Sequence, residues 1–166
     1  MRYRYVCSYL IKTCLFHITN NKIISDFDAV AVIRGEMWAF KSRHFWRIHH
    51  RAESRGDPVE LTAFWYGLPA NVKKIDAVYE RPDHRIVFFA GPYFYVLAGN
   101  SQLEQGPTPL SYLGLPDDLD HIDAAMTWGY NGKTFFFSGK PRFLFCHRTV
   151  KKFTVALKMF REINWQ

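Results

Sequence analysis

The chain has few cysteines and no apolar run of about 18 residues, the length that a transmembrane helix requires. A membrane-spanning helix is therefore not expected. Its three cysteines, Cys7, Cys14 and Cys146, are odd in number and widely spaced, which favours neither a zinc cluster nor a disulfide framework. The apolar stretch near the N-terminus is interrupted by Lys12 and is followed by no small-residue cleavage site, so a secretory signal peptide is not favoured.

Acidic residues are outnumbered overall, because the formal net charge is +7, but this excess is unevenly distributed. Residues 1–26 carry a net charge of +3 and residues 141–166 carry +5, whereas residues 27–140 carry −1. A nucleic-acid-binding protein places its basic side chains on the folded face that meets phosphate. The nearly neutral central segment therefore argues against nucleic acid as a partner.

The sequence also lacks the His-Glu-x-x-His motif of zinc peptidases. The adjacent His49 and His50 would point to opposite faces of a strand, so exposed histidines are a simpler interpretation than a metal pair with His44. Cys146 and His147 are adjacent as well and lack the surroundings of a catalytic nucleophile. We therefore expect no peptidase activity and no catalytic zinc in this chain.

A short word containing Asp-Ala recurs three times, at residues 27–30, 75–78 and 122–125. The steps from one Asp to the next are 48 and 47 residues. Gly-Leu-Pro at residues 67–69 and 114–116 places a proline seven residues before the next Asp in both cases. A repeat of this length is typical of propellers and solenoids, and the leucine-rich and helical signatures of solenoids are missing.

Within each repeat the pattern indicates short strands separated by turns. In the first unit we expect strands over 28–33, 36–40 and 44–49, then a strand or short helix over 60–66. In the second unit we expect elements over 76–80, 85–89, 92–97 and 109–113. Four short elements in about 47 residues correspond to one blade of a β-propeller. We expect large aromatic side chains between the blades, namely Trp38, Trp46, Trp65 and Phe88.

The third unit begins in register and loses it after Lys140. The predicted fold is thus all-β, a β-propeller fragment of two full blades and part of a third. The predicted segments are an N-terminal part at 1–26, blades at 27–73, 74–120 and 121–145, and a C-terminal tail at 146–166. The tail segment Val150–Ile163 has the spacing of an amphipathic helix, and we expect both tails to pack poorly on the blades.

The repeat residues resemble a known domain. The run Phe27–Lys41 looks like the first blade of the hemopexin-like domain of matrix metalloproteinases, and residues 64–69, 121–125 and 132–139 are similar to other parts of it. The second unit, at 89–94 and 102–106, is similar to membrane-type members, especially the lipid-anchored ones. The resemblance covers about residues 27–140.

Two family features are missing. Family members carry a cysteine just before the first blade that bonds to one at the end of the fourth, whereas Lys22–Asp26 contains no cysteine and no fourth blade follows. The tails match nothing in the family, so the sequence suggests an interrupted domain.

The resemblance implies a non-catalytic binding module of an extracellular or cell-surface zinc metalloendopeptidase. Such a module would recognise extracellular matrix proteins such as collagen, tissue inhibitors of metalloproteinases, or partner subunits. Two alternatives are a non-functional gene-model fragment and a stand-alone hemopexin-repeat binding protein. A haem carrier is less consistent with the sequence, because haem ligands would have to come from two domains.

Asp28, Asp76 and Asp123 are the candidate metal site. An Asp at the start of a strand can cap a turn through its side chain. In a propeller, however, the inner strands surround one axis, and matching main-chain carbonyls can form a hard-cation site that suits calcium. The resemblance implies a structural calcium ion held by the main-chain oxygens at these three positions.

Two surface features complete the expectations. Arg43, Arg47, Arg51 and Arg55 could bind an acidic polysaccharide or collagen, although a solvated edge is the simpler interpretation because acidic residues lie nearby. An unfinished propeller would expose the outer face of its first blade and a strand edge near Phe135–Phe137. We therefore expect self-association of the isolated chain.

Overall fold

The computed structural model describes residues 27–48, 57–128, 133–138 and 143–146, which form three antiparallel sheets. The first sheet has its strands in chain order. These are β1 (Ala29–Ile33), β2 (Glu36–Lys41), β3 (His44–Ile48) and β4 (Val59–Glu60). The short helix α2 (Leu61–Phe64) follows β4 directly.

The second sheet repeats this plan, and the third follows it for three strands. The second contains β5 (Ala77–Glu80), β6 (Ile86–Ala90), β7 (Tyr93–Leu97) and β8 (Leu103–Pro109). The 3₁₀ helix η2 (Leu110–Leu113) comes next. The third sheet contains β9 (Ala124–Trp128), β10 (Lys133–Ser138) and β11 (Phe143–Cys146).

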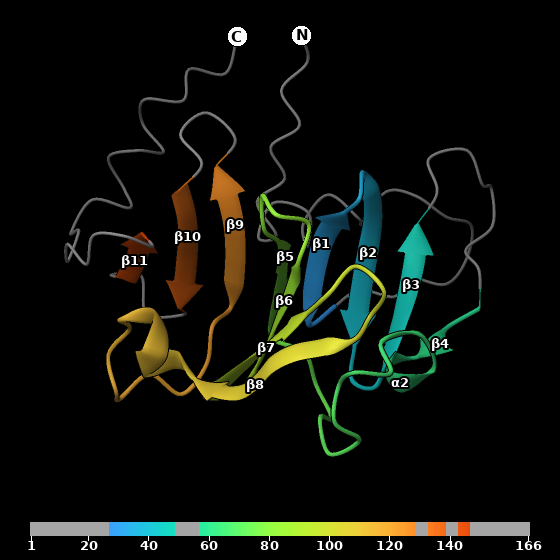
Figure 1. The fold of residues 1–166 in the computed structure, drawn as a ribbon, viewed down its shortest axis with the longest axis horizontal. Coiled ribbons are helices and arrows are strands. Elements are labelled where there is room, and N and C mark those ends of the chain that lie inside the picture. The colour runs from blue at the N-terminus through green and yellow to red at the C-terminus, as the bar shows by residue number, and fades with distance from the viewer. Residues whose placement is uncertain (1–26, 49–56, 129–132, 139–142, 147–166) are drawn as a thin grey trace, which may run out of the picture.

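The inner strands of the three sheets lie side by side, with β5 between β1 and β9 (Figure 1). The sheets fan outward from this centre like the blades of a propeller. The predicted all-β propeller fragment, with two four-stranded blades and part of a third, is therefore confirmed. The individual segment boundaries stay predictions.

The repeated Asp-Ala word has the same structural register in all three blades. The alanine after each Asp pairs with the phenylalanine that ends the aromatic run of the next strand. These pairs are Ala29 with Phe40, Ala77 with Phe89, and Ala124 with Phe137. The three Asp residues thus directly precede equivalent inner strands, as the spacing predicts.

Aromatic rings fill the boundaries between blades. Phe88 of the second blade contacts Phe40 and Trp65 of the first, with ring centroids 5.9 and 5.1 Å apart. Phe89 contacts Phe136 of the third blade at 5.5 Å. Because side chains alternate along a strand, neighbouring residues of β6 serve opposite boundaries. Trp38, Trp65 and Phe88 are buried in the core that the first two blades share, as expected. Trp46 is buried as well, but in a separate cluster, so the expectation that it lies between these blades is wrong.

The first blade has a second apolar face, turned away from the second blade. It carries Phe27, Val30, Ala39 and Trp46, whose side chains are between 0% and 9% exposed. The expectation that this face would be bare is therefore wrong. The expected strand edge at Phe135–Phe137 is wrong too, because β10 pairs with β9 on one side and β11 on the other. Self-association stays a prediction without these two supports.

The fourth elements differ in detail from the sequence pattern. The segment 60–66 is both a strand end and a short helix, since β4 ends at Glu60 and α2 begins at Leu61. The element expected at 109–113 is a short helix, one of the two forms expected for the fourth element of the first unit. The fourth strand of the second blade ends at Pro109, and η2 occupies the expected position.

Several expectations fall outside the described residues: the histidine pair at 49–50, Arg51, Arg55 and the segment Val150–Ile163. None of the helices within the described ranges has the length and apolar character that crossing a lipid bilayer requires.

Candidate functional site

Asp28 and Asp76 cap the second turn of their own blades. The main-chain N–H of Ser42 donates to Asp28 Oδ2 at 2.6 Å, and that of Gly91 donates to Asp76 Oδ2 at 2.7 Å. Ser42 and Gly91 have φ angles of 51° and 57°, in the left-handed region that favours glycine. The interpretation that these aspartates cap a turn through their side chains is therefore correct. It does not depend on whether their main-chain carbonyls bind an ion.

Lys74 joins the two caps across the blade boundary. Its Nζ lies 3.0 Å from Asp76 Oδ1 and 3.7 Å from Asp28 Oδ1. The hydrogen bond to Asp76 is the main reason that the pKa of Lys74 is raised, so the side chain carries a full charge at neutral pH. One ammonium thus faces two carboxylates from neighbouring blades.

Asp123 has a different arrangement. His121 Nε2 lies 3.4 Å from Asp123 Oδ1, and His121 Nδ1 lies 2.7 Å from Asp120 Oδ1. The hydrogen bond with His121 lowers the pKa of Asp120. Asp123 Oδ2 is buried without a hydrogen-bond partner among the described residues, and the turn that corresponds to Ser42 and Gly91 lies outside them.

A cavity of about 350 Å³ lies between the three inner strands. Its wall begins two residues beyond each repeated Asp, at Val30, Val78 and Ala125. The matching starting points show that the three strands face a common axis in the same register. The three Asp residues precede the wall, and Glu80 and His84 belong to the part of the lining farther along the second blade.

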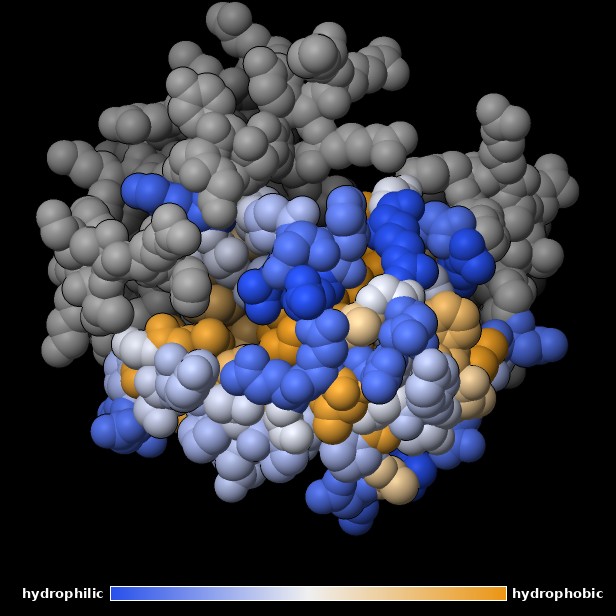
Figure 2. Space-filling view, in the orientation of Figure 1, coloured by the Kyte–Doolittle hydropathy of each residue, from blue (hydrophilic) through white to orange (hydrophobic). Residues whose placement is uncertain are grey.

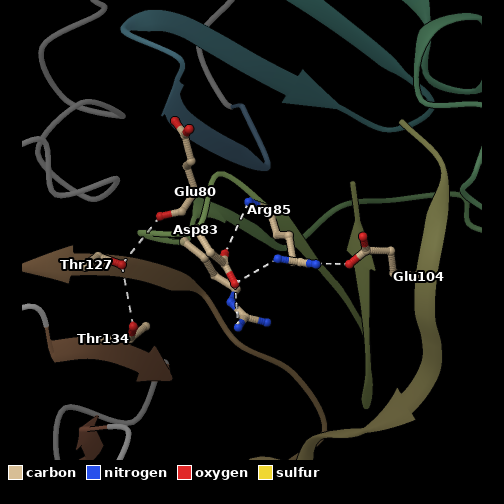
Figure 3. Close-up of polar contacts among 7 residues, drawn as sticks. Glu80, Asp83, Arg85, Glu104, Thr127 and Thr134 are labelled. Carbon is tan, nitrogen blue, oxygen red and sulfur yellow. Dashed lines mark hydrogen bonds and ion pairs between the residues drawn. The ribbon is translucent and has the colours of Figure 1, made fainter. Parts of the chain in front are cut away.

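Polar contacts join the second and third blades at the C-terminal end of β5. The Thr127 hydroxyl of β9 lies 3.5 Å from both the Glu80 carbonyl and the Thr134 hydroxyl (Figure 3). In the same view Arg85 lies between Asp83 and Glu104 and forms an ion pair with each.

The first blade is tied to the same region by Arg34. Its main-chain N–H donates to Glu80 Oε2 at 2.7 Å, and its guanidinium donates to the Gly99 carbonyl. The boundary between the first and second blades therefore has polar ties on both sides of its aromatic core.

The main-chain oxygens of Asp28, Asp76 and Asp123 are available to a hard cation in that no backbone hydrogen bond occupies them in the described turns, loops and caps. Calcium takes such oxygens readily. No group of three or more His, Cys, Asp or Glu side chains suited to a metal occurs in the described residues. These carbonyls could thus hold calcium, and its presence stays a prediction.

The expected arginine patch is partly neutralised where it can be seen. Arg43 forms an ion pair with Glu60 at 3.1 Å, and Arg47 pairs with Glu36. Arg47 also lies 5.5 Å from the centroid of the Trp38 ring. These contacts agree with a solvated edge for the described half of the patch.

The repeats, the register and the axial cavity define a β-propeller built from hemopexin-type blades. The Hemopexin family model matches residues 27–70 and 75–117, which are the first two blades. The chain therefore belongs to the hemopexin family.

Relatives with similar sequences are matrix metalloproteinases. Matrix metalloproteinase-2 of Drosophila melanogaster is 42% identical over 113 residues, and Matrix metalloproteinase-25 of Mus musculus is 45% identical over 117 residues. Matrix metalloproteinase-17 of Homo sapiens is 45% identical over 106 residues. These alignments cover 68%, 69% and 63% of this chain but only 15%, 19% and 17% of the relatives. The part matched is thus the hemopexin region and not the catalytic domain.

Solved structures agree on the fold. The hemopexin fold protein CP4 from cow pea has a TM-score of 0.58 at 16% identity and covers 68% of this chain and 59% of its own. A plant albumin from Cicer arietinum that shows hemagglutination has a TM-score of 0.57 at 14% identity, with 84% and 73% covered. At these identities the likeness shows the fold alone.

The polar contacts between blades were not predicted from the sequence. The cross-blade partners of Lys74 and Arg34, Asp28 and Glu80, each lie 46 residues away in sequence. The repeat contains a signal for Lys74, because His121 stands at the same position, two residues before Asp123, in the third unit.

Proposed function

We propose that this chain is a non-catalytic binding module of a matrix metalloproteinase-type protein. Its ligands would be extracellular matrix proteins such as collagen, tissue inhibitors of metalloproteinases, or partner subunits of the protease. The observation that carries this proposal is the match of two complete blades to the hemopexin family, together with 42–45% identity to matrix metalloproteinases over the same region. Zinc metalloendopeptidase activity would belong to the parent protein and not to this segment.

The location and the ion follow from the same likeness. We propose an extracellular or cell-surface location, as expected for a relative of matrix metalloproteinases. We also propose that calcium is bound by the main-chain carbonyls of Asp28, Asp76 and Asp123, because those oxygens accept no backbone N–H in the described turns and loops. Calcium would supply cohesion between blades and would have no part in a reaction.

Exposed aromatic side chains on the first blade suit a protein ligand. Phe64 is 41% exposed and Tyr66 is 62% exposed, at the end of α2 and just beyond it. Phe64 packs on the buried Trp65, with ring centroids 4.9 Å apart. The Tyr66 hydroxyl donates to the main-chain carbonyl of Asn100, so both exposed side chains are held in place. Exposed aromatics held in this way are favoured in protein recognition. Figure 2 shows hydrophobic residues in separate patches with hydrophilic residues between them.

Binding of the full chain to immobilised collagen and to a tissue inhibitor of metalloproteinases tests the proposal. We expect saturable binding to at least one of them, weakened about threefold or more by Tyr66→Ala, in the range of a modest interface contact. Tyr112→Ala is the matched control, since Tyr112 is exposed on the second blade. Absence of saturable binding to both ligands by a folded chain would contradict the proposal.

A further inference from the structure

In both capping aspartates, the two carboxylate oxygens have different partners. Asp28 and Asp76 each use Oδ2 to accept a main-chain N–H inside their own blade. Each turns Oδ1 toward the Lys74 ammonium, at 3.7 and 3.0 Å. Both aspartates also carry the carbonyls proposed as calcium ligands. Lys74 therefore contacts the side chains of two residues whose carbonyls are the proposed calcium ligands.

The two carboxylates are more enclosed than the cation. The side chains of Asp28 and Asp76 are 22% and 12% exposed, whereas that of Lys74 is 57% exposed. Within the described ranges Lys74 is the basic residue that pairs with them. The three charged groups together carry −1, and the two carboxylates alone would carry −2. Partly enclosed charges are screened less by water and salt than fully exposed ones.

We infer that Lys74 sets the charge of the axial site and thereby limits its affinity for a divalent cation. The inference rests on the proposed calcium site. A positive charge beside the site repels an entering cation, and it also neutralises two anions that would attract one. The main-chain oxygens then act alone as ligands. Lys74 would thus influence the affinity of the site for calcium without being a ligand of the ion.

Calorimetric titration of the full chain with calcium chloride tests this inference. We expect Lys74→Met to bind calcium about threefold more tightly than the wild type, as Coulomb attraction in a partly aqueous setting implies. The difference should shrink in concentrated sodium chloride, because salt screens charges. Lys74→Arg keeps the charge and should bind like the wild type. Lys73→Met removes the same charge from the neighbouring exposed residue and should change the affinity little.

The outcomes separate this inference from the proposed function. Equal or weaker calcium binding by Lys74→Met, in a background where the wild type binds, would overturn the inference and leave the axial site standing. Absence of calcium binding in every variant would overturn both. Thermal unfolding in the presence of a chelator tests the contacts of Lys74 with the two carboxylates independently of calcium. Lys74→Met should unfold at a lower temperature than Lys73→Met if the ammonium contacts exist in solution, and equal unfolding temperatures would contradict those contacts.

Discussion

Phe40 of the first blade meets Phe88 of the second edge to face, with ring centroids 5.9 Å apart and ring planes at 88°. Both side chains are fully buried. They belong to one continuous cluster that also holds Trp38, Trp65 and Ile75. The first two blades therefore share a single hydrophobic core, so a change at this contact should be felt by both of them.

Replacing Phe88 by alanine should lower the free energy of unfolding by about 3–5 kcal/mol, because a large buried ring is lost and a cavity remains. Equilibrium denaturation in urea, followed by tryptophan fluorescence, measures this. Tyr112→Ala is the surface control, since Tyr112 is 75% exposed. Its effect should stay within about 0.5 kcal/mol. Similar losses in both variants would contradict the shared core.

Gly67 has no room for a side chain. A Cβ atom there would lie 2.4 Å from the Ser101 carbonyl oxygen and 2.6 Å from the Leu103 main-chain nitrogen. Gly67→Ala should therefore displace the segment that enters β8 and destabilise the chain strongly. Gly99→Ala is a milder control, because its Cβ would meet only the end of the Arg34 side chain, at 3.1 Å. Melting temperatures by differential scanning calorimetry should rank Gly67→Ala well below Gly99→Ala, and the reverse order would contradict this packing.

The Asp76 carboxylate holds both a turn and a neighbouring ammonium. Asp76→Ala removes the hydrogen bond from the Gly91 N–H and the contact with Lys74. We expect a loss of about 1.5–3 kcal/mol in the free energy of unfolding, the usual range for a hydrogen bond to a charged group. The exposed Asp118 provides the control through Asp118→Ala. Chemical denaturation of the two variants measures the difference, and equal stabilities would show that the cap contributes nothing.

Tyr79 makes stability depend on pH in the alkaline range. Burial raises its pKa from 10.0 to about 12. Between these values the unfolded chain loses a proton that the folded chain keeps, so the free energy of unfolding falls as the pH rises. Below about pH 10 this contribution is fully present.

Tyr79→Phe should reduce this alkaline loss of stability. The free energy of unfolding is measured by urea denaturation at about pH 9 and at about pH 11.5. The first pH lies below the range in which Tyr79 affects stability, and the second lies near its upper end. Tyr112→Phe removes an exposed phenol and should leave the slope as in the wild type. An unchanged slope in Tyr79→Phe would contradict the effect of burial on its pKa.

The repeat was enough to predict the blades, because an Asp-Ala word every 47 or 48 residues determines where each inner strand begins. The fourth strand of the second blade could not be located in this way. Gly106, Pro107 and Pro109 disfavour strands by local propensity, yet Leu103–Pro109 pairs at the outer edge of its sheet, where proline is tolerated.

The candidate site was predictable only in outline. The sequence indicates that three aspartates share a position, and the structure confirms that they precede equivalent strands. The link through Lys74 depends on two distant turns meeting across a blade boundary. The repeat gives only a partial signal for this contact. His121 takes the same position before Asp123, but the residue two positions before Asp28 is Asp26, which carries the opposite charge.

Collagen is one of the proposed ligands, and we expect this chain to bind it without cleaving it. Co-sedimentation of the purified full chain with fibrillar collagen, followed by electrophoresis of pellet and supernatant over time, tests both parts together. We expect the chain to enter the pellet in a saturable manner while the collagen stays intact, with or without added zinc. A folded chain that stays in the supernatant, or collagen fragments that accumulate and disappear with a chelator, would contradict this expectation.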